Sequence, residues 1–100
     1  MQAKIIIKRK FIKGKQSEII ALLRELRSGA LQQPGYISGE TLTSSEDPQT
    51  LVVISSWQDM ESWIGWRENN TRKTLEKMLE TYQETASEYQ ELTSGTFIEG

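Results

Sequence analysis

The sequence predicts an α+β fold with the element order βαββαβ, in which an antiparallel sheet carries its helices on one face. Two patterns lead to this prediction. Stretches rich in β-branched residues alternate with stretches in which apolar residues recur every three to four positions, and Gly, Pro, Asn and Asp separate them. Because strand-helix-strand crossovers are right-handed, both crossovers place their helices on the same face. With 36% hydrophobic and 26% charged residues, the 100 residues suit one domain spanning 1–100.

The first predicted element is a strand over residues 3–13, which Gly14 ends. One face of it carries Ile5, Ile7, Arg9 and Phe11. The other face carries Ile6, Lys8, Lys10 and Ile12. Since both faces contain apolar residues and the helices cover only one, we expect a second copy of the chain to cover the other. We interpret the lysines as solvent-exposed side chains of that strand and not as a basic arm that binds a partner.

A helix is predicted next over residues 18–30, with Ser17 as its N-cap. Its apolar positions recur at helical spacing and are Ile19, Leu22, Leu23 and Leu26. Pro34 and Gly35 then form a turn, and a second strand covers 36–43. Gly39 in that strand indicates a bulge or a close approach of another group.

A polar loop over 44–49 leads into a third strand over 51–54, whose continuous apolar run predicts burial on both faces. Asp59 is expected to cap a helix that continues through Arg67 and breaks near Asn69 and Asn70.

Another helix is predicted over 71–85. Its apolar stripe consists of Leu75, Met78, Leu79 and Tyr82. The last strand is predicted weakly over 89–93. Phe97 and Ile98 either extend that strand or pack as a tail.

Composition excludes several kinds of chemistry. The chain has no cysteine and no histidine, so thiolate and imidazole cannot serve as nucleophile, base, haem ligand or metal ligand. We therefore expect neither a metal nor a cofactor. A formal net charge of −2 makes nucleic acid an improbable partner. No leader and no long apolar run occur, so we expect no membrane association and a cytoplasmic location.

All three tryptophans lie between positions 57 and 66. Trp57 ends the buried strand and is expected to close the corner between strand and helix. Trp63 is expected in the core or in a pocket wall. Trp66 lies at a polar break, where we expect a half-exposed indole unless a ligand or partner covers it.

Four short motifs carry a resemblance to a known family. They are Lys13-Gly14-Lys15, Gln33-Pro34-Gly35-Tyr36, Asp47-Pro48 and Ser56-Trp57-Gln58-Asp59, the last followed by a helix with an aromatic residue. In order and spacing they resemble the antibiotic biosynthesis monooxygenase family over essentially the whole chain. The resemblance implies ferredoxin-like subunits that form a dimeric α/β barrel, with a pocket between sheet and helices in each subunit. It also implies either cofactor-independent oxidation of phenolic or quinol-type aromatics by oxygen, or oxidative haem degradation.

The haem-degrading branch of that family has a tryptophan at the place of Trp66. It has a histidine where this chain has Glu76, and an asparagine where this chain has Ile7. A carboxylate is a poor substitute for the iron-binding imidazole, and Ile7 cannot donate a hydrogen bond. We therefore expect no haem degradation.

The resemblance places several side chains in one pocket. If Ile7 faces the helices, so does Arg9, two residues further along the strand. Arg9 would stabilise a substrate anion, Glu76 or Glu40 would accept a proton, and Trp66 would stack on the ring. Other candidate ligand contacts are Ile7, Trp63, Tyr82 and Tyr36.

The alternative interpretation has Arg9 pairing with a surface carboxylate, and Glu76 pairing with Arg72 or with neighbours of Glu80 on a solvated helix face.

The sequence is compatible with two main functions. The first is a cofactor-independent monooxygenase acting on a small aromatic of the phenol or quinol type. The second is a non-catalytic dimeric α/β-barrel protein that binds a small molecule, and a purely structural dimer with a filled pocket is a third possibility. The first two require a cavity of roughly 300 Å³ or more beside Trp66.

Overall fold

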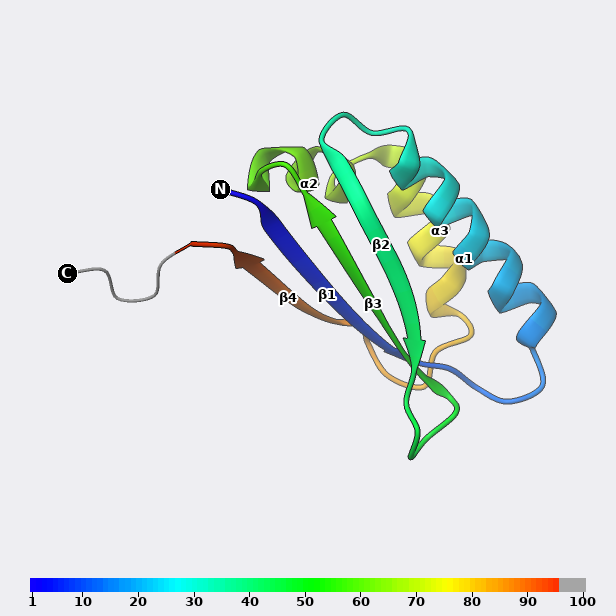
Figure 1. The fold of residues 1–100 in the computed structure, drawn as a ribbon. Helices are drawn as coiled ribbons and strands as arrows, with labels where there is room; N and C mark the ends of the chain where they lie inside the picture. The colour runs from blue at the N-terminus through cyan, green and yellow to red at the C-terminus, as the bar shows by residue number, and fades with distance from the viewer. Residues whose placement is uncertain (96–100) are drawn as a thin grey trace.

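The computed structural model describes residues 1–95 and contains one four-stranded antiparallel sheet with the strand order β2-β3-β1-β4 (Figure 1). The strands are β1 (Ala3–Lys10), β2 (Tyr36–Thr43), β3 (Thr50–Trp57) and β4 (Glu88–Thr93). The helices are α1 (Gln16–Leu31), α2 (Met60–Arg67) and α3 (Asn70–Glu80). The βαββαβ order is the ferredoxin-like α+β fold, with the second helical element divided into α2 and α3. The predicted fold class is confirmed.

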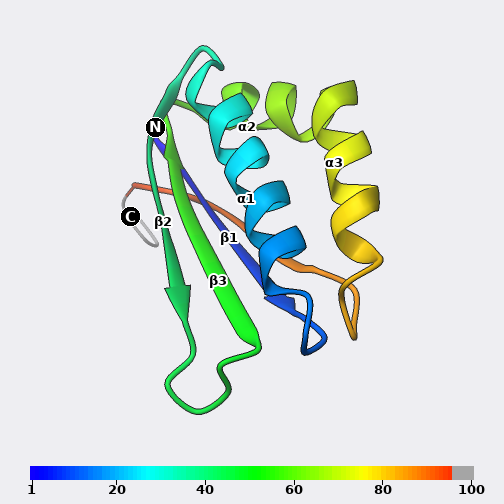
Figure 2. The ribbon, with the colours of Figure 1, turned by 90° about the vertical axis from the view of Figure 1, so that its right-hand side faces the viewer.

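All three helices lie on one face of the sheet (Figure 2). The predicted break between α2 and α3 is confirmed, and each of these helices begins with a side-chain cap. Asp59 accepts a hydrogen bond of 2.8 Å from the Ser62 amide, and Asn69 accepts one of 2.8 Å from the Thr71 amide. The Asn69 cap fixes the start of α3 and therefore which of its residues face the sheet.

Three predicted boundaries were wrong. β1 ends at Lys10, because Phe11 leaves the ladder with β3 and makes only an isolated bridge with Gln83. α1 begins at Gln16, so Ser17 lies inside the helix, and no side chain caps its start. α3 ends at Glu80 and not at 85. Residues 97 and 98, for which a strand extension or a tail was predicted, lie outside the described residues.

The core lies between the sheet and the helices. The odd-numbered residues of β1 face the helices and are buried, whereas Lys4 and Lys8 are exposed. The largest fully buried side chains are Trp57, Trp63, Ile5 and Leu79. Trp57 closes the corner between β3 and α2 as predicted, with its ring centroid 5.2 Å from that of Tyr36 and 5.8 Å from that of Trp63. This corner forms one end of the space between the layers.

The opposite face of the sheet carries a band of apolar residues that nothing in the described chain covers. Ile6 lies opposite Ile54 across the β1–β3 ladder, and Val52 lies beside them on the same face. These three residues are only half-buried, and Leu42 and Leu92 on the edge strands are 45% and 47% exposed. β3 was predicted to be buried on both faces. In the single chain only the helix side is covered.

None of the helices within residues 1–95 has the length and apolar character that crossing a membrane requires.

Candidate functional site

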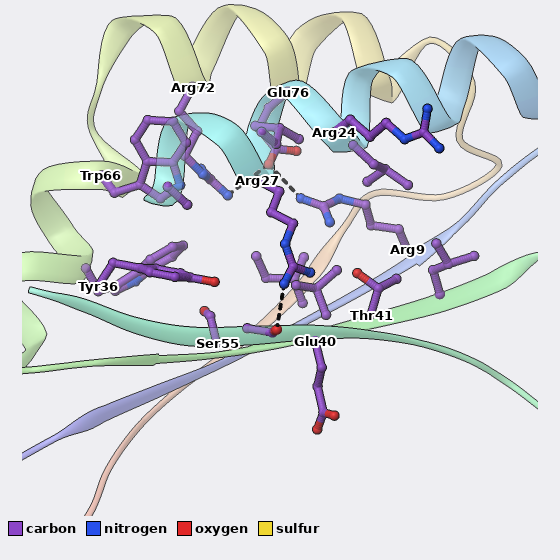
Figure 3. A pocket seen from close by; sticks show the side chains of 18 of the residues that line it. Arg9, Arg24, Arg27, Tyr36, Glu40, Thr41, Ser55, Trp66, Arg72 and Glu76 are labelled. Atoms are coloured by element: carbon purple, nitrogen blue, oxygen red, sulfur yellow. Dashed lines mark hydrogen bonds and ion pairs between the residues drawn. The ribbon is translucent and has the colours of Figure 1, made fainter. Parts of the chain in front are cut away.

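A cavity of about 350 Å³ lies between the sheet and the helices (Figure 3). Its walls are mainly apolar and aromatic and come from β1, β3, α1 and α2; they include Ile7, Leu23, Leu26, Val53, Trp57, Trp63 and Trp66. Ile7 and Trp63 therefore lie where the sequence predicted ligand contacts. The volume falls within the range of pockets that bind small molecules. The cavity predicted beside Trp66 is present.

Trp66 is almost fully covered, with 4% of its surface exposed, so the prediction of a half-exposed indole was wrong. The indole lies against Gly29 of α1. A Cβ atom added at Gly29 would lie 2.4 Å from the ring carbon Cη2 of Trp66, which is closer than any real contact. The absence of a side chain at Gly29 therefore lets α1 cover the ring. Trp66 remains a wall of the cavity while α1 shields it from solvent.

Three charged residues form a buried cluster at the cavity. Nη2 of Arg9 lies 2.6 Å from Oε2 of Glu76, and Nη2 of Arg72 lies 2.9 Å from the same oxygen. The exposed fractions are 3% for Arg9, 5% for Arg72 and 7% for Glu76. The alternation along β1 brings Arg9 to the helix side, as the sequence predicted. The alternative predicted the pairing of Glu76 with Arg72 correctly, but the pair is buried rather than solvated, and Arg9 pairs with Glu76 and not with a surface carboxylate.

Arg72 was not recognised as a cavity residue from the sequence. Its Nη2 donates a hydrogen bond of 2.8 Å to the Tyr89 hydroxyl, and its guanidinium carbon lies 5.1 Å from the centre of the Trp63 ring. A cation over an indole face is stabilised by the charge distribution of the ring. Arg72 precedes Leu75 by three residues and Glu76 by four, so extending the apolar stripe of α3 backwards would have placed it on the buried face.

Two buried atoms of the cluster have no hydrogen-bond partner within residues 1–95. They are Nε of Arg9, a donor, and Oε1 of Glu76, an acceptor. Buried polar atoms nearly always have partners, so an unpaired donor and an unpaired acceptor on two ion-paired side chains indicate a place for a missing group. A hydroxyl group can accept from the first and donate to the second.

Trp63 is held in place by β4. Its indole N–H donates to a carboxylate oxygen of Glu91, and Nη1 of Arg67 lies 2.7 Å from that oxygen. These two hydrogen bonds, the one from Trp63 first, lower the pKa of Glu91 below its ordinary value of 4.5. Trp63 is therefore a rigid wall of the cavity.

One predicted site residue does not line the cavity, and another lines it without pointing its carboxylate inward. Tyr82 is half-buried in a shallow depression beside Leu22 and Met78, because α3 ends before it and the helical spacing that predicted its direction is lost. The side chain of Glu40 points away from the cavity (Figure 3). Of the two candidate proton acceptors, only Glu76 points inward.

Tyr36 lines the cavity, as the sequence suggested. A Cβ atom added at Gly39 would lie 2.6 Å from the Tyr36 hydroxyl oxygen, so Gly39 marks a close approach, one of its two predicted roles. The pairing of β2 with β3 is also irregular between Tyr36 and Ser38.

No set of three or more His, Cys, Asp or Glu residues in the described part of the chain is arranged to hold a metal ion.

The fold and the cavity together define the class of the chain: a ferredoxin-like α+β protein with a cavity of about 350 Å³ between its sheet and helices. Residues 3–85 match the family described as antibiotic biosynthesis monooxygenase, and the chain belongs to this family. The comparison with curated proteins found no match.

Solved structures share the fold at low sequence identity. A conserved protein from Methanosarcina mazei is 18% identical, with a TM-score of 0.88, over 95% of this chain and 94% of that one. SnoaB, a cofactor-independent oxygenase from Streptomyces nogalater, is 15% identical, with a TM-score of 0.80, over 98% of both chains. A putative antibiotic biosynthesis monooxygenase from Nitrosomonas europaea is 14% identical, with a TM-score of 0.84, over 99% of this chain and 94% of that one.

Proposed function

We propose that this protein is a cofactor-independent monooxygenase that oxidises a small aromatic of the phenol or quinol type with molecular oxygen. The observation that carries the proposal is the buried Arg9–Glu76 ion pair beside a cavity walled by tryptophans, in which Nε of Arg9 and Oε1 of Glu76 have no hydrogen-bond partner within residues 1–95. A phenol or enol hydroxyl supplies the complement that these two atoms lack. Family membership and the fold shared with SnoaB support the same reaction class.

The roles of the residues follow from the geometry. The aromatic ring lies against Trp66, and Ile7 and Trp63 complete the apolar walls. The substrate hydroxyl gives its proton to Oε1 of Glu76, and the guanidinium of Arg9 stabilises the resulting anion. Arg72 holds Glu76 from the other side, so the carboxylate stays aligned. The walls also keep bulk water away from the anion.

The oxidation of such an anion needs no external electron donor. If the reacting carbon is a CH2 group conjugated to the ring, as in an anthrone, dioxygen oxidises it to a carbonyl group. One oxygen atom stays on the carbon, and the other leaves as water with the two hydrogens. The task of the protein is to favour the electron-rich anion, because the anion reacts with oxygen far more readily than its acid.

We also propose that the protein does not degrade haem. Ile7 presents an apolar wall where the haem-degrading branch has a hydrogen-bonding side chain. The carboxylate of Glu76 is already engaged by two guanidinium groups. A saturable, stoichiometric Soret shift with turnover in a haem titration would refute this proposal.

The apolar band on the open face of the sheet supports a homodimer that closes an α/β barrel. Ile6, Val52 and Ile54 form the centre of this band, and Leu42 and Leu92 flank it. Contiguous exposed apolar residues of this kind mark interaction surfaces. A second copy of the chain offers a matching surface, because a two-fold interface pairs a patch with itself.

Oxygen uptake with a panel of quinols and anthrones tests the proposed oxidation. The wild type should consume oxygen with at least one of these compounds. Arg9→Ala should lower the rate by about a hundredfold, as expected for loss of one group that stabilises the developing charge. Trp66→Phe should raise KM more than it lowers kcat, because the ring is a binding wall.

Lys77→Gln, which removes a charge from the exposed side of α3, serves as the control and should behave as the wild type. If no compound is oxidised but tryptophan fluorescence shows saturable binding, the protein is the non-catalytic binder and the proposed oxidation is wrong.

A further inference from the structure

Two arginines lie at the mouth of the cavity and are not used by the proposed reaction. The exposed members of the cavity lining belong to α1 and to the edge strand β2, so the cavity opens between these two elements. Arg24 and Arg27 are on the α1 side of this opening, three residues apart and therefore on one helix face. In Figure 3 the Arg27 side chain extends across to the strand, whereas the Arg24 side chain extends along the helix layer. Nη2 of Arg27 donates a hydrogen bond of 3.3 Å to the Gly39 carbonyl oxygen.

The residues that line the cavity carry a net positive charge. Its lining includes four arginines, Arg9, Arg24, Arg27 and Arg72, whereas Glu76 is the one carboxylate whose side chain points inward among the described lining residues. Within residues 1–95, no carboxylate lies within ion-pair distance of Arg24 or Arg27. The whole chain has a formal net charge of −2, so the charge of this region is opposite in sign to that of the chain. Apolar walls focus such a field on whatever enters the cavity.

The inner and outer arginines have different partners. Arg9 and Arg72 share the Glu76 carboxylate at the inner end, where the substrate hydroxyl is placed. Within residues 1–95, the one hydrogen bond made by the guanidinium groups of Arg24 and Arg27 is the one from Arg27 to the Gly39 carbonyl oxygen. Their other N–H groups are therefore available to a ligand. A guanidinium presents paired N–H groups that match a planar carboxylate.

We infer that the substrate is an aromatic carboxylate, with its acid group bound by Arg24 and Arg27 at the mouth and its hydroxyl at Arg9 and Glu76. This inference rests on the proposed function and adds the substrate class. The ring then spans the apolar middle of the cavity beside Trp66. The arginines at the mouth fix which end of the substrate enters first, so they determine specificity and take no part in the reaction.

Calorimetric titration under anaerobic conditions tests the inference without requiring turnover. The probes are homogentisate, a quinol with a carboxylate side chain, and its methyl ester, in which a methyl group replaces the negative charge. The wild type should bind the acid at least about tenfold more tightly than the ester, which corresponds to about 1.4 kcal/mol. Raising the salt concentration should weaken binding of the acid and leave binding of the ester nearly unchanged.

Substitution of both Arg24 and Arg27 tests whether these residues cause the preference for the acid. The double variant Arg24→Gln/Arg27→Gln should bind the acid only as tightly as the ester, whereas the control Lys77→Gln should keep the wild-type preference. Equal affinity of the wild type for acid and ester, binding of neither probe, or a preference that survives the double substitution would each overturn the inference.

The two proposals fail separately. A preference for the acid without oxygen uptake would support the carboxylate site at Arg24 and Arg27 and refute the oxidation. Oxidation of acid and ester with equal kcat/KM would support the oxidation and refute the inference.

Discussion

Arg9 on β1 and Glu76 on α3 form a buried ion pair of 2.6 Å, although 67 positions separate them in the sequence. The pair joins the sheet to the helix layer beside the cavity, and Arg72 binds the same carboxylate oxygen. A buried charge is tolerated only when it is paired and hydrogen-bonded. The cluster therefore connects the stability of the fold with the chemistry proposed for the site.

Glu76→Gln should destabilise the protein substantially. The substitution keeps the size of the side chain but leaves the guanidinium groups of Arg9 and Arg72 buried without an anion. Removing one partner of a buried pair typically costs about 3 to 5 kcal/mol. Urea denaturation should show this loss in the free energy of unfolding. Glu80→Gln, an exposed position one turn further along the same helix, should change it by less than about 0.5 kcal/mol.

Gly29→Ala should disturb the wall that Trp66 forms. The new methyl group would lie 2.4 Å from the indole, so the ring or α1 must move. Overpacking of this kind costs about 1 to 3 kcal/mol. Thermal denaturation should record a lower Tm, and the tryptophan emission should shift. Gly65→Ala is the matched control, because no atom lies within 4 Å of the added methyl group and alanine favours the helix. A Gly29→Ala variant as stable as Gly65→Ala would contradict the packing described for Trp66.

Glu91 should contribute stability that depends on pH. Hydrogen bonds from Trp63 and Arg67 lower the pKa of Glu91 in the folded protein, so its contribution is complete above the unfolded value near 4.5 and is lost as the pH falls through the lower folded value. The side chain is 33% exposed, so solvent screening limits the effect to roughly 1 kcal/mol.

Urea denaturation of wild type and Glu91→Gln over a range of pH checks this expectation. The variant should be less stable at neutral pH, and the difference should shrink below pH 4.5. A difference that stays constant or grows as the pH falls would mean that Glu91 is not held as described.

Ile54→Lys should disrupt the proposed dimer. Ile54 lies at the centre of the apolar band, opposite Ile6 in the β1–β3 ladder, and a lysine there would have to lose its hydration inside an interface. Light scattering should find the wild type as a dimer and the variant as a monomer. Met78→Lys, which replaces a half-exposed apolar residue on α3, should remain dimeric. A monomeric wild type would refute the dimer outright.

The sequence predicted the parts of the site that depend on local periodicity. Alternation along β1 put Ile7 and Arg9 on one face, and this held because the ladder with β3 is regular through both residues. The prediction failed where direction depended on a boundary or on packing across the fold. Tyr82 points elsewhere because α3 ends at Glu80, two residues before it. The burial of Trp66 depends on Gly29 of another helix, which no local pattern reveals.

The proposed oxidation requires that the cavity binds a phenol and favours its anion at Arg9. Anaerobic absorbance titration with para-nitrophenol, whose anion is yellow, measures this directly at a pH where the free phenol is mostly protonated. The wild type should bind the compound saturably with growth of the anion band, and Arg9→Gln should bind it without that band. Binding of the uncharged phenol by the wild type, or no saturable binding at all, would contradict the claim.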